Sequence, residues 1–565
     1  MMRTTRLYLL VAVCSVAAPV LAQNRLPKGA FTDFNVPEED EQGNLRWNLH
    51  GDRGRMRSEN LVELEGVKVE FYRDGKVDMT VTTTGCLFDR REKQATTDGT
   101  VEIQAGNYQI TGRGLEWQSG KSLVQMNRDV KIVLPHGLKT TAGVVPAADA
   151  PKIPTVITSE RGAFDTSRRV VTLEGKVVVE DLEMKLRADK MLVTFAGDNQ
   201  AQQIEATGNV EIQQKDIAAR GERAMYTRVD GKMVLTGNPT VKQPQWKVDG
   251  TEIVFFHEQQ LVICQQVRLF LEQGAAGLTA KPDPAKPMTF VVAEHGAFDP
   301  KTRTAALEGN VVVTDPQMVL TAKRLNLTLD EKSEVSRIDA MGGVVMKQME
   351  KTARGERAVY TRSDGRVVLT GDPSVTDSQG NVRGEEIVFN KDSDTMVVER
   401  CVLTLQETAA GATALLPDQP NVPAKKGPTV VRAGRGTFAG QKRTARFDQN
   451  VAVDAPDMQL TATTMDVIFD DKQAIMRLEA DGDVRITQQG KSARGDHAVY
   501  TPRDGNVALT GRTWIEMADG SVECETITYN RTTQKFIFSG NARLTIKGGA
   551  ASIPNLLPKK EAAKP

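Results

Sequence analysis

The chain has 565 residues with 73 basic and 73 acidic side chains, and aromatic residues make up only 5% of it. Its length exceeds that of one ordinary domain, and its balanced charge lacks the basic excess that is typical of nucleic-acid-binding proteins. With 47 glycines and few aromatic residues, the composition favours a turn-rich β protein with aliphatic strands over a helical enzyme with one large core.

The first 22 residues have the pattern of a secretory signal. Arg3 and Arg6 form a basic start, the apolar run Leu7–Val20 has secretory length, and the small residue Ala22 precedes the expected cleavage point. The run is short for a membrane span, and polar sequence follows it. We therefore expect an exported protein that begins at Gln23. An uncleaved signal that stays as a membrane anchor is the alternative.

Three copies of one pattern follow, and the body of each copy has the same length. The phrase AARGERAMYT begins at Ala218 and returns as TARGERAVYT from Thr352 and as SARGDHAVYT from Ser492. The glycines of RGAF and LTGNP, Gly162 and Gly237, are 75 positions apart, and their counterparts keep that separation. A shorter period of about thirty residues lies inside each copy, which is room for two or three strands. Such periods indicate units that stack because one unit alone cannot bury its apolar face.

Apolar and polar residues alternate over two consecutive runs in each copy, which predicts antiparallel strands with one aliphatic face and one wet face. The aliphatic positions are Met184, Leu186, Met191, Val193 and Phe195 in the first copy, Met318, Leu320, Leu325, Leu327 and Leu329 in the second, and Met458, Leu460, Met465, Val467 and Phe469 in the third. Two polar residues separate the runs, and we expect a short turn there.

Two further motifs predict local structure. The pair Asp230-Gly231 and its two counterparts lie between strands, where a hairpin turn needs positive φ. In the phrase ARGERA we expect Gly221 to form a turn and Arg220 to pair with Glu222 in solvent. The alanine and tyrosine after them should face the same side of a strand.

Motifs for catalysis or metal binding are incomplete or missing. His257-Glu258 begins a zinc-protease pattern, but Leu261 stands where the second histidine is needed. Four cysteines follow the signal without CxxC spacing: Cys86, Cys264, Cys401 and Cys524. Export is compatible with a disulfide or with isolated buried thiols. We predict a protein without enzymatic activity, metal, cofactor or nucleic-acid ligand. The aliphatic faces then form either a closed core or a slot for acyl chains.

The GNV motifs, the A-x-x-x-x-Y strands and the LTGNP motifs resemble the OstA-like family, the periplasmic lipopolysaccharide-transport proteins of the LptA and LptC type. The resemblance covers Thr155–Ile546 in three tandem copies, and Leu61–Leu134, with DGTVEI and YQITGRGLEW, resembles the LptC-type module. It implies an all-β fold of open β-jellyrolls, stacked end to end as an elongated β-solenoid-like array with a hydrophobic groove.

The resemblance also implies a domain organisation. The expected parts are a signal peptide at 1–22, an LptC-like module at 23–136, OstA-like modules at 155–273, 288–408 and 429–547, and a disordered tail at 548–565. Proline-rich connectors lie between the modules, and they put uninterrupted stacking of the strands in doubt.

The implied function is a periplasmic, non-catalytic conduit for lipopolysaccharide transport to the outer membrane, with the fifteen aliphatic positions as its groove. The implied partners are lipopolysaccharide or a related lipid and other lipopolysaccharide-transport components at the inner and outer membranes. End-to-end self-association and association with a membrane stay open. The alternative is a structural β-solenoid scaffold of the cell envelope with a fully packed core and no lipid groove.

Overall fold

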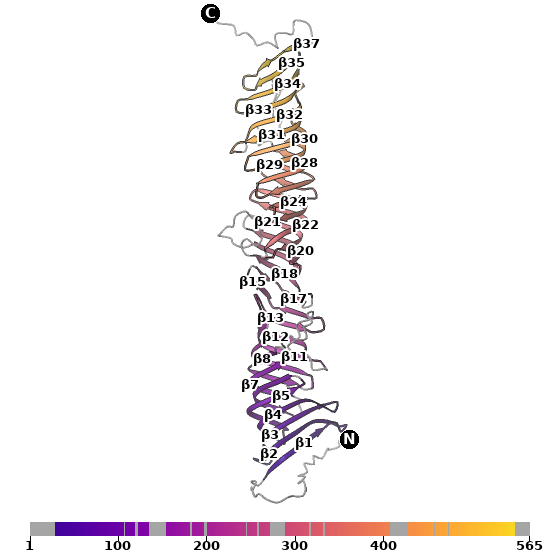
Figure 1. Cartoon of the computed structure of the whole chain (residues 1–565), viewed down its shortest axis with the longest axis vertical. Helices are drawn as coiled ribbons and strands as arrows, with labels where there is room; N and C mark the ends of the chain where they lie inside the picture. Colours follow the sequence, from indigo (N-terminus) through magenta and orange to yellow (C-terminus); the bar gives the residue numbers. More distant parts are fainter. Residues whose placement is uncertain are drawn as a thin grey trace. The chain divides into compact units, whose positions relative to one another are not determined.

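The protein is built from β-strands (Figure 1). The structure, a computed structural model, describes residues 29–106, 108–118, 123–134, 154–165, 167–180, 184–196, 201–244, 246–256, 259–271, 289–315, 318–331, 334–406, 427–456, 458–472 and 474–547. All regular elements in these ranges are strands, and they pair antiparallel, which confirms the expected all-β class. In this part of the chain, no helix is long and apolar enough to cross a membrane. The expected signal and tail, and nearly all connector residues, lie outside the described residues.

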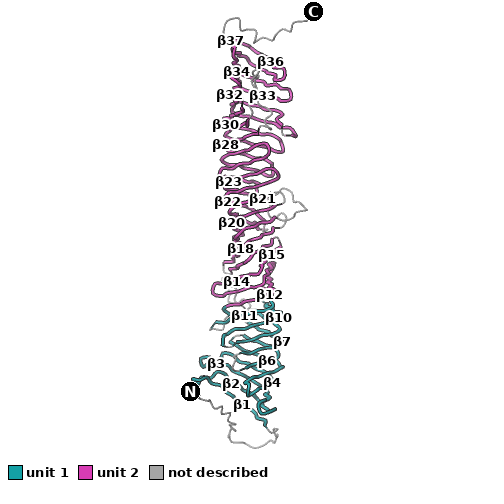
Figure 2. Tube along the Cα trace, turned by 180° about the vertical axis from the view of Figure 1, so that it is seen from behind, with its two compact units in different colours: residues 1–138, 151–182, 188–202 teal, residues 139–150, 183–187, 203–565 magenta. Residues whose placement is uncertain are grey.

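The chain divides into two compact units (Figure 2). The first comprises residues 1–138, 151–182 and 188–202, and the second comprises residues 139–150, 183–187 and 203–565. The strands of the first unit are β1 (Ala30–Glu39), β2 (Leu45–Met56), β3 (Leu61–Arg73), β4 (Lys76–Asp89), β5 (Gln94–Ala105), β6 (Tyr108–Gln118), β7 (Leu123–Leu134), β8 (Thr155–Ser159), β9 (Arg161–Asp165) and β10 (Val170–Glu180). β11 (Met184–Phe195) and β12 (Ala201–Gln214) contain residues of both units.

The second unit holds the remaining strands. They are β13 (Ile217–Thr227), β14 (Lys232–Thr236), β15 (Thr240–Gln243), β16 (Trp246–Asp249), β17 (Glu252–Phe256), β18 (Leu261–Leu271), β19 (Thr289–Asp299), β20 (Thr304–Asp315), β21 (Met318–Leu329), β22 (Val335–Gln348), β23 (Lys351–Thr361), β24 (Arg366–Thr370), β25 (Ser374–Thr376), β26 (Gly380–Arg383), β27 (Glu386–Asn390), β28 (Thr395–Leu405), β29 (Thr429–Ala439), β30 (Thr444–Ala455), β31 (Met458–Phe469), β32 (Ile475–Gln488), β33 (Lys491–Thr501), β34 (Asn506–Met517), β35 (Gly520–Asn530), β36 (Lys535–Ser539) and β37 (Arg543–Ile546). In Figure 1 they follow one another in chain order.

Most strands bend at a corner in their middle. In β3, Val62 and Leu64 are buried, Glu65 and Gly66 are both exposed, and Val67 begins a second run of buried alternate residues. Two adjacent outward residues shift the alternation by one position, so both halves of the strand can turn an apolar side inward. The two halves pair with the neighbouring strands in the same register on both sides of the corner, and they form two arms that enclose an apolar interior.

The short turns expected between the two aliphatic runs are such corners, so that prediction was wrong. Asp189 and Lys190 are the two exposed residues at the corner of β11, which continues unbroken through them. Lys323 and Arg324 have the same place in β21. From sequence alone, two adjacent polar residues between alternating runs fit a turn or a corner equally well. Only the pairing with the neighbouring strands separates the two.

Positive-φ residues form the corner in alternate strands. In β12, Gly208 and Asn209 have φ of 78° and 47°, and the register against β13 shifts between Thr207 and Val210. Two residues of one strand thus oppose one residue of the next, which is a β-bulge that bends the strand. Glycine and asparagine tolerate this backbone conformation better than other residues do. The GNV motif thus lies in the middle of a strand.

The repeated phrase ARGERA also belongs to a corner. Gly221 lies inside β13 and not in a turn, which corrects the sequence-based expectation. A Cβ at this position would come 2.9 Å from the carbonyl oxygen of Thr236, so the neighbouring backbone leaves no room for a side chain. The alanine and tyrosine face the same side as expected, since Ala358 and Tyr360 are both buried in the second copy.

The carboxylate of the phrase lies over the corner glycine of the next strand. In the second copy a Cβ on Gly371 would come within 2.5 Å of the Cβ of Glu356. The expected ion pair between Arg220 and Glu222 is replaced by one between Arg220 and Glu211, at 3.2 Å. The phrase recurs because each corner needs a glycine inside one strand and an outward carboxylate against the glycine of the next.

Hairpins form at the Asp-Gly pairs as expected. Gly231, Gly365 and Gly505 have φ of 57°, 60° and 64°, and they precede β14, β24 and β34. Only the glycine of each pair has positive φ, which glycine adopts without steric cost, and the Gly231 N–H donates to the carbonyl of Arg228 at 3.3 Å.

The strand that follows the Asp-Gly hairpin differs among the copies. It is interrupted where its corner residue is proline and continuous where that residue is threonine. Pro239 separates β14 from β15, and Pro373 separates β24 from β25, since proline has no N–H for the ladder. The third copy has Thr513 at this place, and β34 runs through it. Gly250 opposes Pro239 and donates its N–H to the proline carbonyl at 3.1 Å. In the third copy the Thr513 hydroxyl donates to the carbonyl of Cys524 at 2.7 Å instead.

The strand ladder passes each connector without a break. Leu134 pairs with Thr155, Leu271 with Thr289, and Leu405 with Thr429, so strands on either side of a connector are direct neighbours. The doubt about uninterrupted stacking is therefore removed for these three junctions. The expected module boundaries stay predictions, and the division into compact units falls inside the first expected OstA-like module.

The third copy reverses one pair of corner residues. In the second copy Glu294 lies over Gly309, where an added Cβ would come 2.7 Å from the Glu294 Cβ. In the third copy the glycine is Gly434 and the long side chain is Gln449, with φ of 69°. A Cβ on Gly434 would come 2.5 Å from the Gln449 side-chain oxygen. The space between the two corner residues has room for one side chain, which comes from either strand but not from both.

This reversal predicts a double-mutant result. Gly434→Glu should lower the free energy of unfolding by about 1–3 kcal/mol, because it overpacks against Gln449. Gln449→Gly should change it by less than about 1 kcal/mol, because relief of positive φ offsets the entropy of glycine. The double variant recreates the arrangement of the second copy and should regain most of the loss in urea unfolding. Strictly additive effects would show that the two positions do not share one space.

Candidate functional site

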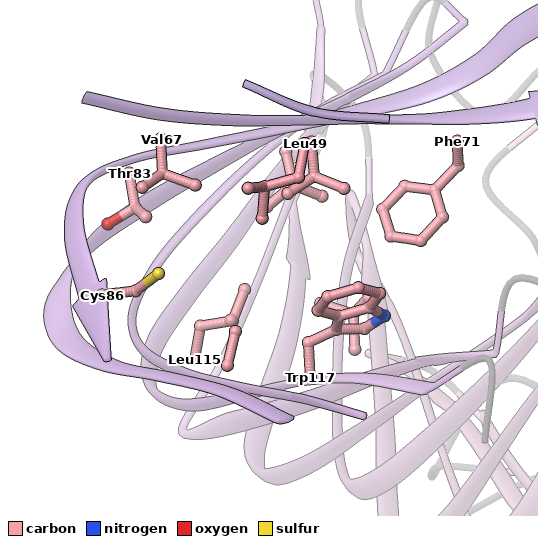
Figure 3. A pocket seen from close by; sticks show the side chains of 11 residues that line it. Leu49, Val67, Phe71, Thr83, Cys86, Leu115 and Trp117 are labelled. Atoms are coloured by element: carbon pink, nitrogen blue, oxygen red, sulfur yellow. The ribbon is translucent and has the colours of Figure 1, made fainter. Parts of the chain in front are cut away.

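A narrow apolar cavity lies between the two arms of the first unit (Figure 3). One arm contributes Leu49, Val67, Val69, Phe71, Val81 and Thr83, and the other contributes Cys86, Ala95, Leu115, Trp117 and Val124. These residues come from β2 to β7, and the alternation on each side of the corner turns them inward. In Figure 3, Thr83 and Cys86 lie beside the bend, and Phe71 and Trp117 lie on the opposite side.

The cavity is too narrow for a hydrocarbon chain in this state. Its empty space amounts to about 390 Å³, but only about 20 Å³ is wide enough for the centre of a water molecule. One buried water needs roughly 10–15 Å³ by that measure. An acyl chain could therefore enter only if the two arms moved apart.

Three aromatic rings hold the arms together on the side opposite the corner. Trp47 of one arm meets Trp117 of the other edge to face, with ring centroids 5.0 Å apart. Phe71 meets Trp117 at 5.9 Å in the same manner. Such aromatic pairs contribute roughly 0.5–1.5 kcal/mol each beyond the area they bury. A ligand that enters on this side would have to displace these ring contacts.

Three buried cysteine thiols in the interior carry no charge. Burial raises the pKa of the Cys86 thiol to about 12, so the thiol stays protonated at neutral pH. Burial likewise raises the pKa of Cys264 and Cys401 to about 12. All four cysteines after the signal are buried and free, so no disulfide joins them.

The aliphatic positions identified in the sequence lie mostly in the interior. Ten are buried: Leu186, Met191, Val193, Leu320, Leu325, Leu327, Met458, Leu460, Met465 and Val467. Five are half-buried at strand ends: Met184, Phe195, Met318, Leu329 and Phe469. Because they belong to β11, β21 and β31, which do not pair with one another, they line three separate stretches and not one site.

The cavity of the first unit was missed from sequence. Alternation in the segment LVELEGVKVEF, residues 61–71, carried the signal for its first arm. The contribution of Trp117 depends on the position of the corner at Gly114, where φ is 70°, and a single glycine does not identify a corner.

Tyr500, the tyrosine of the repeated phrase in the third copy, has a polar surrounding. A hollow of about 580 Å³ there includes Tyr500, Tyr529 and Arg531 in its lining. The Arg531 guanidinium donates to the Tyr500 hydroxyl at 2.6 Å and stacks over its ring. Burial raises the pKa of Tyr226 and Tyr360. No group of three or more metal-ligating side chains occurs within the described ranges.

Comparisons with known proteins agree with the sequence pattern. The family described as LptA/(LptD N-terminal domain) LPS transport protein matches residues 156–261, 291–395 and 430–535. The family described as lipopolysaccharide-assembly, LptC-related, matches residues 31–134. These four segments together span most of the chain and support the expected order of one LptC-related segment before three repeats.

Individual relatives match shorter parts. The lipopolysaccharide export system protein LptA of Escherichia coli (strain K12) is 27% identical over 128 residues, which are 21% of this chain and 66% of that protein. The LptA of Shigella flexneri matches with the same figures. The chain thus spans just under two thirds of the length of these relatives. The crystal structure of LptH, the LptA homologous periplasmic component from Pseudomonas aeruginosa, is 22% identical, with a TM-score of 0.20 over 27% of this chain and 98% of that chain.

Burial of Leu320 generates a prediction on stability. The side chain is 4% exposed, so Leu320→Asp should lower the free energy of unfolding by roughly 3 kcal/mol or more at neutral pH. Burial raises the pKa of the new carboxyl above its unfolded value of about 3.9. The deficit should therefore be complete above the folded pKa and shrink as pH falls toward the unfolded one.

The neighbouring position provides a matched control. Val319 is 36% exposed on the outer face of the same strand, so Val319→Asp should leave thermal melting nearly unchanged. Equal melting of the two aspartate variants would mean that water reaches Leu320 and that the interior is open.

Proposed function

The chain belongs to the LptA/(LptD N-terminal domain) family of LPS transport proteins and carries an LptC-related domain before its three family repeats, and from this premise we propose that it is a lipopolysaccharide conduit. In this proposal the acyl chains of the lipid travel through the apolar interior between the arms. The protein acts without catalysis in the periplasm, after export by the signal at its N-terminus.

The observation that carries the proposal is the repetition of the inward aliphatic positions. Leu186, Leu320 and Leu460 occupy one equivalent place in the three copies, and all are buried. Most buried side chains of the repeats are aliphatic, and the thiols of Cys264 and Cys401 stay neutral, whereas Asp315 is a buried carboxylate that accepts a hydrogen bond from Thr289. An aliphatic lining suits hydrocarbon that has to slide, because it holds the chain by no strong directional contact.

Continuity of the ladder supports movement from one repeat to the next. Within the second unit, β18 pairs with β19 and β28 with β29 across the two connectors, so no unpaired strand edge interrupts either junction. An unpaired edge would place backbone N–H and C=O groups beside the lipid, and such groups are costly next to hydrocarbon.

The arrangement of hydrogen bonds allows the interior to widen. Among the described strands, residues pair within each arm, as β3 does with β4, where Glu65 pairs with Gly85 before the corner and Val67 with Thr83 after it. Opening the arms would therefore break side-chain contacts across the interior and bend the corners, but leave the ladders intact. We propose that an acyl chain enters in this way and replaces those side-chain contacts by its own.

The partners follow from the same proposal. Other lipopolysaccharide-transport components at the inner and outer membranes would supply and receive the lipid, and the ends of the strand ladder would be the surfaces that meet them. The competing interpretation is a scaffold whose core is permanently packed. The burial of Leu325 and Leu327 fits both interpretations, so occupancy by lipid has to be measured.

Photocrosslinking distinguishes the conduit from the packed scaffold. A photoreactive phenylalanine analogue at Leu327, which is buried, should form a product with lipopolysaccharide in cells, detected by antibody against the lipid. The same analogue at Asn326, the neighbouring residue of opposite orientation, should form little or none. If neither position reacts while both variants keep a near-native melt, the conduit is refuted and the packed scaffold is favoured.

A further inference from the structure

One hydrogen-bond donor in the cavity of the first unit lacks an acceptor. Trp117 lines the cavity from β6 and is 3% exposed, and its indole Nε1 has no hydrogen-bond partner in the described structure. A buried N–H without an acceptor loses its bond to water and gains nothing in return. Native proteins pair nearly all such groups, so an unpaired one inside a cavity indicates an absent acceptor.

The orientation of the indole is fixed by its neighbours. Trp47 and Phe71 both pack edge to face against it, which leaves the ring little freedom to rotate. In Figure 3 the nitrogen lies on the side of the ring that is turned away from Leu115 and the corner. The donor therefore belongs to the aromatic side of the interior, where the arms would part to admit a ligand.

A comparison within the chain indicates that this place favours a polar-tipped aromatic residue. Trp117 is the second inward residue after the corner of β6, and Tyr500 is the second inward residue after the corner of β33. The Tyr500 hydroxyl is bonded to Arg531 at 2.6 Å. Trp117 has the same place in the cross-section of its own unit but no such partner. The first unit thus differs from the second in this respect: the indole N–H of Trp117 is available to an acceptor outside the chain.

The lining restricts the chemistry of the missing acceptor. The residues around Trp117 include Leu49, Leu115 and Val124, and no charged side chain lines the cavity. A phosphate or carboxylate would lose its hydration there without a cation to replace it. A plain hydrocarbon chain would fill the space but offer no acceptor. Two acceptors fit this lining: a water molecule, for which the space of about 20 Å³ has room, and the neutral oxygen of an apolar chain. Binding of an ester compared with a hydrocarbon distinguishes the two.

We propose that Trp117 forms a subsite for an acyl chain, in which its indole N–H donates to an ester or amide carbonyl or to a hydroxyl on the chain. The subsite rests on the proposed conduit and deepens it. The interior of the second unit would treat acyl chains as hydrocarbon, whereas the first unit would also recognise the oxygen that they carry. A lipid would thus be held at one fixed position in the first unit, with the oxygen of its acyl chain at Trp117.

The test uses the purified full chain and two probes, methyl tetradecanoate and hexadecane. Binding of each is measured to the natural protein and to Trp117→Phe, which keeps an aromatic ring but removes the donor. The preference for the ester over the hydrocarbon should fall about three- to tenfold in the variant, the size of one hydrogen bond. Trp514→Phe is the matched control, because Trp514 lies under Arg494 outside the cavity lining and should leave the preference unchanged.

A second measurement needs no change at Trp117. In protein labelled with ¹⁵N at the indole nitrogens, the four tryptophans give four resonances, which phenylalanine variants of the other three assign by elimination. Methyl tetradecanoate should move the Trp117 indole proton downfield, and hexadecane should not. An unmoved resonance, an unchanged preference in Trp117→Phe, or failure of both probes to bind would each overturn the subsite. Lipopolysaccharide micelles and phosphatidylcholine vesicles, compared by the same resonance, then distinguish the source of the acyl chain.

The two proposals fail separately. If Leu327 crosslinks to lipopolysaccharide while the Trp117 resonance stays unmoved, the conduit stands and the subsite is refuted. If the ester moves the resonance while Leu327 does not crosslink, the first unit binds a small acyl lipid and the conduit is refuted.

Discussion

The corner in the middle of the strands is the constraint on which the rest of this structure depends. A strand has to bend sharply there and still pair with its neighbours on both sides. The bend requires two adjacent outward residues, positive φ in alternate strands and a backbone approach that leaves room for one side chain only. These three requirements explain the repeated glycines, the asparagines after them and the carboxylate of ARGERA. Because the strands bend or are interrupted at this corner, their halves form two arms with an interior between them.

The second property follows from pairing between neighbours in the chain. An unbroken strand pairs with the strand before and after it, and where a strand is split at its corner its two halves pair with the same neighbour, as β14 and β15 both do with β13. The fold therefore grows by addition and its contacts are local in sequence. The connectors do not disturb this order, because Leu271 and Leu405 pair directly with the first residues after them. A long connector costs little, since the entropy of loop closure rises only slowly with loop length. Repeats can therefore be joined by connectors of different length without a seam in the ladder.

The interior combines tight packing with the means to open. Side chains from both arms fill it so closely that the cavity of the first unit has little room beyond one or two waters. Yet the arms are joined by corners and by apolar contacts, and those contacts have no preferred direction. Hydrocarbon can replace them at small cost, whereas a charged group could not, since burial already holds the Cys86 thiol neutral. The chemistry of the interior thus favours lipid chains as occupants and disfavours polar solutes.

The sequence by itself determined the class of fold, the threefold repeat, the hairpins at Asp-Gly and the inward face of the alternating runs in each repeat. Alternation with a period of two is local, so it identifies Leu320 as inward and Val319 as outward without knowledge of any neighbour. The tertiary structure alone decided what separates the alternating runs, because two adjacent polar residues become a turn or a corner according to strand pairing. It also decided the path of the ladder past the connectors and the width of the interior. Trp117 meets Trp47 and Phe71 only because the corner brings three strands together, and that contact spans residues that no local pattern relates.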